Sequence, residues 1–332
     1  MNCQLDRNQR APTRPNPRTR IFCAIILCAF ALAWYARGAR ASFAATCPEF
    51  SPAVARGAVE SAALTEISGI AASRVNSNVL WAHNDSGDSA RVFAMSATGR
   101  HLGIYAFADA SAVDWEDLAI GPGAISGQDY IYVGDTGDNA RARSFVVVYR
   151  APEPTVDINQ TPANTTVSGW EAFPLQYPAS QYDAETLLVD PSSGDIFLVT
   201  RDRAHEGFAR VFRKPAPHTH QITTTLELVA TIALPYEVKG GDIASAGDAV
   251  ILRLHSGSTP MHGYLWTRAP GTNLWDAFNI APCLVPLPTE PQGEALGFAP
   301  GGLGFWTISE GSFQPIYYSS RHSSLALPLV AR

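Results

Sequence analysis

The stretches "DWEDLAIGP" (114–122) and "YIYVGDTGDN" (130–139) decide the fold of this chain. Each contains a short run of aromatic, β-branched and other apolar residues, bounded by acidic residues and glycines. Runs of this length and composition are typical of antiparallel strands joined by turns. We therefore expect a hairpin whose second strand delivers Asp135 toward the end where the first strand begins.

The same pattern recurs along the chain. Polar residues precede a short apolar strand, a second and a third strand follow, and a fourth is less regular. The first strands are "EISGIAAS" (66–73), "DWEDLAIGP" (114–122), "DAETLLVDP" (183–191), "GGDIASAG" (240–247) and "QGEALGFAP" (292–300). Four strands per unit at a spacing of about 50 residues are typical of β-propeller blades.

We count five blades of an all-β propeller. A sixth is possible if the long interval between Glu116 and Glu185 hides a degenerate one. A β-sandwich, the alternative architecture, does not predict the recurrence of acids. Residues 57–64, "GAVESAAL", could supply a strand to the last blade and close the ring.

The chain ahead of the repeat has the order of a secretory signal. Residues 1–20 carry five arginines, residues 21–36 are apolar, and small residues follow. The apolar stretch falls short of the about 20 residues that span a bilayer, so cleavage is favoured over an uncleaved anchor, which is the alternative. We predict a signal peptide at 1–41, no membrane span after cleavage, and one propeller domain at 42–332. The mature protein would be secreted or periplasmic and monomeric.

Cleavage would also change the charge and the cysteine content. It removes seven of the 24 basic residues and one of the 30 acidic ones, which leaves a formal charge of −12. Such a surface repels phosphate backbones and excludes nucleic acid as a partner. Of five cysteines only Cys47 and Cys283 remain. We expect them to form one disulfide in an oxidising compartment, and two separate thiols are the alternative.

The first strand of each blade lines the central channel of a propeller. The aligned first strands predict a ring of five residues: Ser68, Glu116, Glu185, Asp242 and Glu294. Side chains alternate with period two, so the residues two positions earlier face the same way. They include Glu66, Asp114 and Asp183. The second strands end near the same mouth with Asn84, Asp85, Asp135, Arg201, Arg253 and Glu310.

So many carboxylates in one channel require a counter-charge, because like charges raise each other's pKa or attract a cation. A set of oxygen ligands with few histidines suits calcium (Ca2+) better than zinc. Arg201 and Arg253 would either pair with the acids or bind an anionic substrate. His83 is the best candidate for a general base. Each acid taken alone favours a structural role, and only the recurrence favours a site.

The motifs "SGIAAS", "HNDSGD", "DWEDLA", "GDTGDN", "DAETLLVDP", "GGDIA" and "QGEALGF" resemble, as a set, a family of exported bacterial propeller proteins of unsettled activity. More distantly, the acid-lined axis is similar to calcium-dependent propeller hydrolases, namely lactonases of the SMP-30 and paraoxonase kind and propeller phytases. This similarity implies a calcium held by Glu66, Asn84, Glu116, Asp135, Glu185 and Glu294. It also implies water activation by a nearby histidine or carboxylate, here His83, Glu116 or Asp135.

Three functions agree with these patterns. The first is a calcium-dependent hydrolase of an ester, lactone or phosphoester. The second is a non-catalytic propeller that binds a protein or a glycan, with calcium or ion pairs serving the structure. The third is a glycosidase with paired carboxylates. We expect a small-molecule or glycan ligand in the central channel.

Overall fold

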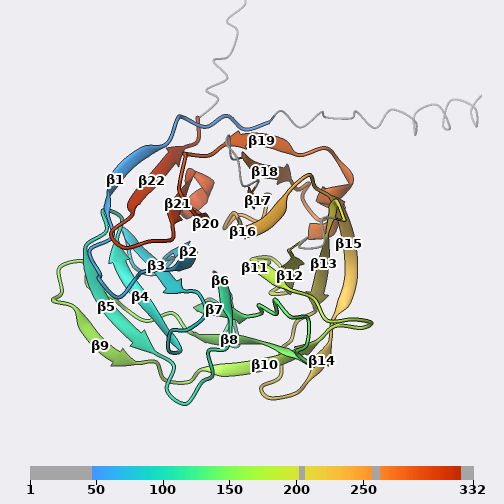
Figure 1. The fold of residues 1–332 in the computed structure, drawn as a ribbon, viewed down its shortest axis with the longest axis horizontal. Helices are drawn as coiled ribbons and strands as arrows, with labels where there is room; N and C mark the ends of the chain where they lie inside the picture. The colour runs from blue at the N-terminus through green and yellow to red at the C-terminus, as the bar shows by residue number, and fades with distance from the viewer. Residues whose placement is uncertain (1–46, 202–205, 256–261, 323–332) are drawn as a thin grey trace, which may run out of the picture. The chain divides into compact units, whose positions relative to one another are not determined.

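Five β-sheets surround a common centre in the computed structural model of the protein, which describes residues 47–201, 206–255 and 262–322 (Figure 1). Three sheets have four strands and two have five. The first strand of each sheet is innermost, so the predicted five-bladed, all-β propeller is confirmed. The predicted signal peptide, residues 1–41, lies outside the described residues. Within the described ranges, no helix has the length and apolar character needed to cross a membrane.

The blades are numbered 1 to 5 in the order of their innermost strands, and their strands are given from the inside outward. Blade 1 contains β2 (Ile67–Ala72), β3 (Val79–Asn84), β4 (Arg91–Ser96) and β5 (His101–Ala106). Blade 2 contains β6 (Trp115–Pro122), β7 (Asp129–Asp135), β8 (Val146–Pro152) and β10 (Glu171–Gln176). Blade 3 contains β11 (Ala184–Val189), β12 (Ile196–Thr200), β13 (Phe208–Lys214) and β15 (Glu227–Ala233). Blade 4 contains β16 (Glu237–Ile243), β17 (Ala249–His255), β18 (His262–Thr267) and β19 (Cys283–Pro286). Blade 5 contains β20 (Gly293–Phe298), β21 (Gly304–Ser309), β22 (Pro315–Ser320) and β1 (Val54–Ala58).

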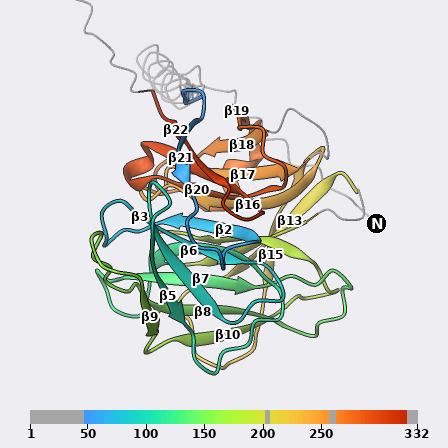
Figure 2. The same ribbon diagram turned by 60° about the vertical axis from the view of Figure 1, so that its left-hand side comes forward.

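The long interval between Glu116 and Glu185 holds no blade of its own. It supplies β10 to blade 2 and β9 (Ala163–Thr166), which adds to β5 of blade 1 in parallel. Figure 2 shows β9 and β10 at the lower edge of the sheets. In the same way β14 (Thr224–Thr225) reaches back from blade 3 and adds to β10 in parallel. Two short 3-10 helices, η1 (Leu274–Asn279) and η2 (Pro300–Gly302), complete the described elements.

Both ends of the described chain meet in blade 5, because β1 pairs with β22. The last blade therefore takes a closing strand, as predicted, but this strand is Val54–Ala58 and shares only Gly57 and Ala58 with the predicted stretch 57–64. The predicted disulfide also forms, with the Cα atoms of Cys47 and Cys283 5.5 Å apart. Cys283 lies on β19 of blade 4, so the disulfide ties the segment ahead of β1 to the neighbouring blade.

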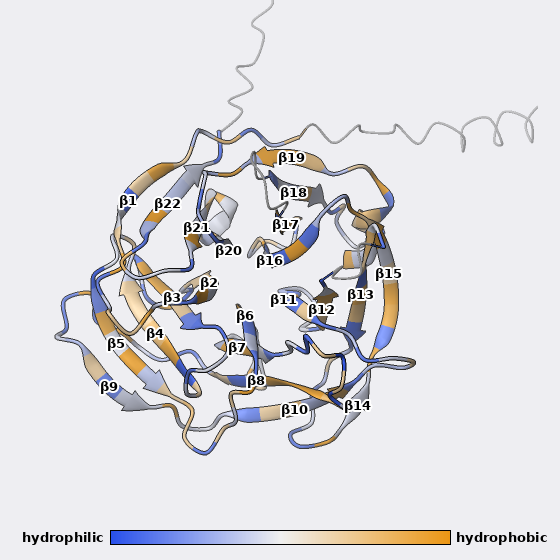
Figure 3. Cartoon of the chain, viewed as in Figure 1, coloured by the Kyte–Doolittle hydropathy of each residue, from blue (hydrophilic) through white to orange (hydrophobic). Residues whose placement is uncertain are grey.

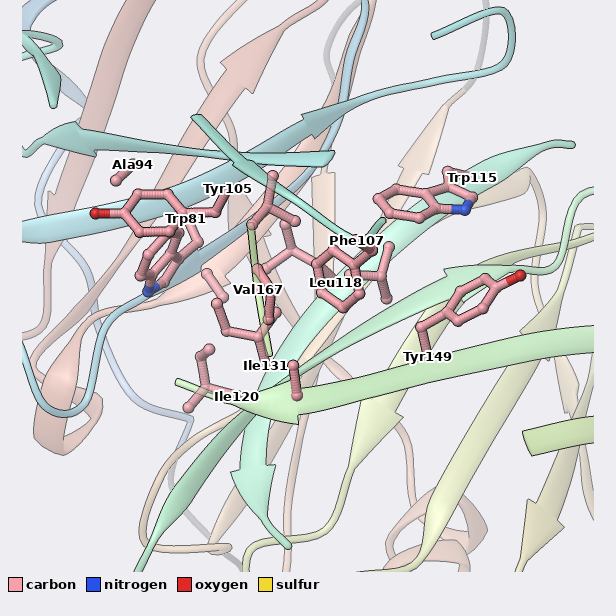
Figure 4. Packing of buried hydrophobic residues seen from close by; sticks show 14 of the residues in the cluster. Trp81, Ala94, Tyr105, Phe107, Trp115, Leu118, Ile120, Ile131, Tyr149 and Val167 are labelled. Atoms are coloured by element: carbon pink, nitrogen blue, oxygen red, sulfur yellow. The ribbon is translucent and has the colours of Figure 1, made fainter. Parts of the chain in front are cut away.

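Apolar clusters fill the space between neighbouring blades. Between blades 1 and 2, Trp81 of β3 and Trp115 of β6 share a cluster with Phe107 and Tyr149 (Figure 4). The Phe107 and Trp115 rings meet edge to face with centroids 5.9 Å apart. Hydrophobic residues occur on strands of all five sheets (Figure 3). Burial of aromatic surface stabilises these contacts, at roughly 25 cal/mol per Å², and so fixes the positions of the innermost strands.

Candidate cation site at the acidic mouth

Each innermost strand carries a β-bulge at the same point of its pairing with the second strand. A bulge inserts one extra residue, which leaves the ladder and is aimed differently from its neighbours. The extra residues of blades 1 to 5 are Ser68, Glu116, Glu185, Lys239 and Glu294. Four of the five members of the predicted ring therefore occupy equivalent positions.

Blade 4 differs from the prediction, because its bulge lies at Lys239 and not at Asp242. Asp242 lies three residues further along β16 and accepts the backbone N–H groups of Ile243 and Phe298, at 2.7 and 2.8 Å. It lines a cavity of about 250 Å³ at the opposite ends of the innermost strands. The sequence feature that could have indicated the correct position is Lys239, since the chain has only two lysines.

Seven carboxylates gather where the innermost strands begin and the second strands end, and this region is called the acidic mouth. They form three overlapping groups, in each of which one oxygen of every residue lies within 4.8 Å of the others. The groups are Asp85–Glu294–Glu310, Asp85–Asp114–Glu116 and Glu116–Asp183–Glu185. The structure thus brings Glu116, Glu185 and Glu294 of the predicted ligand set to one place.

Two basic side chains neutralise one side of the acidic mouth. The Lys239 ammonium group lies 2.7 Å from an oxygen of Glu185 and 2.7 Å from an oxygen of Glu294. Arg201 pairs with Glu185 as well, and its Nε lies 2.6 Å from Glu237. Arg201 therefore acts as a partner of the mouth acids, one of the two roles expected for it. Burial raises the pKa of Glu185, while Lys239 and Arg201 act in the opposite direction.

The other side of the mouth lacks such partners. The Glu116 side chain is only 3% exposed, and among the described residues its carboxylate makes no hydrogen bond and no ion pair. Burial, followed by repulsion from neighbouring acids, raises the pKa of Glu116 well above its usual value. Burial is also the largest cause that raises the pKa of Asp114 to about 6 and the pKa of Asp85 above its usual value. Removal of a carboxylate from water without a partner is costly, and a bound cation would offset this cost.

The turn "GDTGDN" shapes this side of the mouth. Thr136 donates its hydroxyl to the carbonyl of Ala184 at 2.8 Å, which ties blade 2 to blade 3. The Cα of Gly137 lies so close to Glu116 and Asp114 that a β-carbon would overlap both side chains. The backbone N–H of Asp138 binds the Asp183 carboxylate at 2.8 Å. The glycine therefore makes room for the carboxylates.

Asn84 and Asp135, both predicted ligands, bind the backbone of the segments that precede β2 and β6. The Asn84 side-chain oxygen accepts the backbone N–H groups of Thr65 and Glu66, at 3.0 and 3.1 Å. Asp135 accepts backbone N–H groups from the two residues ahead of β6. It also pairs with Arg143 at 2.8 Å. Asp135 does not belong to the three carboxylate groups, and the side-chain oxygen of Asn84 is already bound by backbone N–H groups.

His83, the predicted general base, is 0% exposed. Its Nδ1 lies 2.7 Å from the carbonyl oxygen of Asn84, and its ring meets Trp115 edge to face. Burial lowers the pKa of His83 to about 4, so the ring is neutral near pH 7. A side chain without contact to solvent has no route to a water molecule at the mouth.

The remaining two predicted site residues, Arg253 and Glu66, do not belong to the three carboxylate groups. The Arg253 side chain is 0% exposed, and its Nη2 lies 2.5 Å from Glu290. It also donates to the carbonyl of Ala295, so it joins blades 4 and 5 and offers no surface to a substrate. Glu66 is exposed and lines a separate cavity of about 280 Å³ with Asn84.

No family model and no curated protein matches the chain. Among solved structures, the chain is similar to the one described as the WD40 repeats of RRP9, with a TM-score of 0.40 and 9% sequence identity. The match covers 82% of this chain and 100% of that one. The relation to lactonases and phytases therefore stays a hypothesis.

Proposed function

We propose that the acidic mouth binds a divalent cation through Asp85, Asp114 and Glu116, and that this cation is calcium. The observation that carries the proposal is the buried Glu116 carboxylate, which has no partner among the described residues and lies close to two other acids, Asp85 and Asp114. Three carboxylates with oxygens within 4.8 Å of one another are donors of the kind that calcium prefers. The bound ion would join blades 1 and 2 at the mouth.

The proposed ligand set differs from the predicted one in its donors, although the expected metal is the same. Of the six predicted ligands only Glu116 stays. Asp85 and Asp114 join it, and the proposed site no longer includes Glu66, Asn84, Asp135, Glu185 and Glu294. In this proposal the protein is an exported propeller whose mouth loops, held by the ion, bind a small-molecule or glycan ligand. The disulfide between Cys47 and Cys283 is consistent with export.

A calcium titration of the purified protein tests the proposal. We expect Glu116→Gln to weaken calcium binding by at least about tenfold, because the amide supplies one neutral oxygen in place of a charged carboxylate. The measurement is isothermal titration calorimetry after removal of metal with a chelator. Glu153→Gln is the matched control. Its carboxylate is also buried, but it is hydrogen-bonded to Ser73 and Trp81 away from the mouth. Equal affinities in wild type and Glu116→Gln would refute the assignment.

A hydrolase of an ester, lactone or phosphoester is the second candidate, and one observation favours it. Glu310 is half-buried at the mouth outside the proposed ligand set, and burial and repulsion from Glu294 raise its pKa to about 8, which suits an acid–base group near neutral pH. Calcium, when bound, would polarise the ester or phosphoryl oxygen. Assays of the same two variants on a panel of such substrates separate the candidates. Turnover by wild type and Glu153→Gln, with loss in Glu116→Gln, would favour the hydrolase.

A further inference from the structure

Among the five extra residues of the β-bulges, Ser68, Glu116, Glu185, Lys239 and Glu294, only Lys239 carries a positive charge. It extends from β16, which packs between β11 of blade 3 and β20 of blade 5. Its side chain is only 9% exposed, and its ammonium group lies 2.7 Å from a carboxylate on each neighbour, Glu185 and Glu294. The ammonium group therefore lies where a metal ion would bridge the same two carboxylates.

The charges divide the acidic mouth into two sides. On the side of blades 3 to 5, Glu185 and Glu294 are both paired with Lys239. On the side of blades 1 and 2, Asp85, Asp114 and Glu116 make no ion pair with any described residue. A divalent cation is repelled by an ammonium group and needs oxygens that are not already neutralised.

We infer that Lys239 is a built-in cation that fills a second metal position in the acidic mouth, between Glu185 and Glu294. The protein then binds a single divalent ion, on the side of blades 1 and 2. Loss of the ammonium group opens the second position, where Glu185 and Glu294 supply oxygen ligands. This inference rests on the proposed function for the wild-type ion, but its own readout is the difference in ion count between variant and wild type.

The test counts bound calcium ions in the purified protein by equilibrium dialysis and metal analysis. We expect one ion for wild type and two for Lys239→Met. Lys214→Met is the matched control and should keep the wild-type count. Lys214 is the other lysine of the chain, is also buried, and lies at the far end of β13 from the mouth. A count for Lys239→Met no higher than that of wild type overturns the inference.

The two proposals fail in different ways. A wild-type protein that binds no calcium refutes the proposed function, and a gain of one ion in Lys239→Met would still support the role of Lys239. One ion in both proteins refutes only the inference.

A second pair of variants keeps the test decisive if Lys239→Met does not fold without metal. Lys239→Gln retains a hydrogen-bond donor for the two carboxylates and should also bind one ion more than wild type. Glu294→Gln in the wild-type background should keep the count at one, because Glu294 is bound to Lys239 and not to the metal. Loss of the wild-type ion in Glu294→Gln at saturating calcium would overturn the assignment.

Discussion

Burial favours the neutral form of several carboxylates of the acidic mouth, Asp114 and Glu310 among them. Burial raises the pKa of Asp114 to about 6 and, with repulsion from Glu294, the pKa of Glu310 to about 8. Unfolded carboxyl groups titrate near pH 4, so the native state binds more protons than the unfolded state between about pH 4 and 8. The contribution of these groups to stability is therefore complete below about pH 4 and is lost as the pH rises to about 8.

We therefore expect the metal-free protein to lose stability as the pH rises from 5 to 8, and saturating calcium to cancel much of this loss. Calcium affinity should fall as the pH is lowered, by roughly tenfold per pH unit for each proton that the ion displaces. Urea unfolding at a series of pH values, with and without calcium, measures both effects. Asp114→Asn removes one of the titrating groups and should flatten the metal-free profile. Stability that rises with pH in the metal-free protein would contradict this account.

At the scale of the element, the turn between β7 and β8 positions the carboxylates of the neighbouring strand. Gly137 lies against Asp114 and Glu116, so the Gly137→Ala methyl group would push both side chains out of place. We expect calcium affinity to fall by about tenfold or more, with little change of fold. Gly134→Ala, near the end of β7 just ahead of the turn, is the control, because the nearest side-chain atom to its added methyl group is 3.1 Å away. Unchanged binding in Gly137→Ala would show that the turn does not shape the site.

The sequence predicts the elements better than it predicts the directions of their side chains. The strands of the blades are recognisable because each combines apolar residues with a bounding turn, and the five-blade count follows from them. The sequence does not reveal the register of β16, since Gly240 and Gly241 carry no side chain and the pattern aligns Asp242 with the ring in place of Lys239. Asn84 and Asp135 have the donor chemistry of ligands, but the backbone N–H groups ahead of β2 and β6 already bind them. Donor type is visible in a sequence, whereas competition from the backbone is not.

At the scale of the whole molecule, the ring of blades is closed by contacts between segments far apart in the sequence. β1 completes blade 5, and all five of its residues are exposed, so it adds backbone pairing and little burial. The disulfide holds the segment ahead of β1 to blade 4 across a sequence separation of 236 residues. A cross-link over so long a loop restricts the unfolded chain and stabilises the native state by about 2 to 5 kcal/mol.

We therefore expect the double variant Cys47→Ser/Cys283→Ser to melt several degrees lower than wild type, by roughly 2 to 4 °C for each kcal/mol lost. Calcium affinity should stay unchanged, because Cys283 lies on the outermost strand of blade 4 and the mouth acids lie on the innermost strands or next to the ends of the innermost and second strands. Differential scanning calorimetry and a calcium titration measure the two quantities. Reduction of wild type should reproduce the shift and leave the variant unaffected. A variant that keeps the wild-type melting temperature would show that β1 closes the ring without the disulfide. A loss of calcium binding would show that closure of the ring affects the geometry of the acidic mouth.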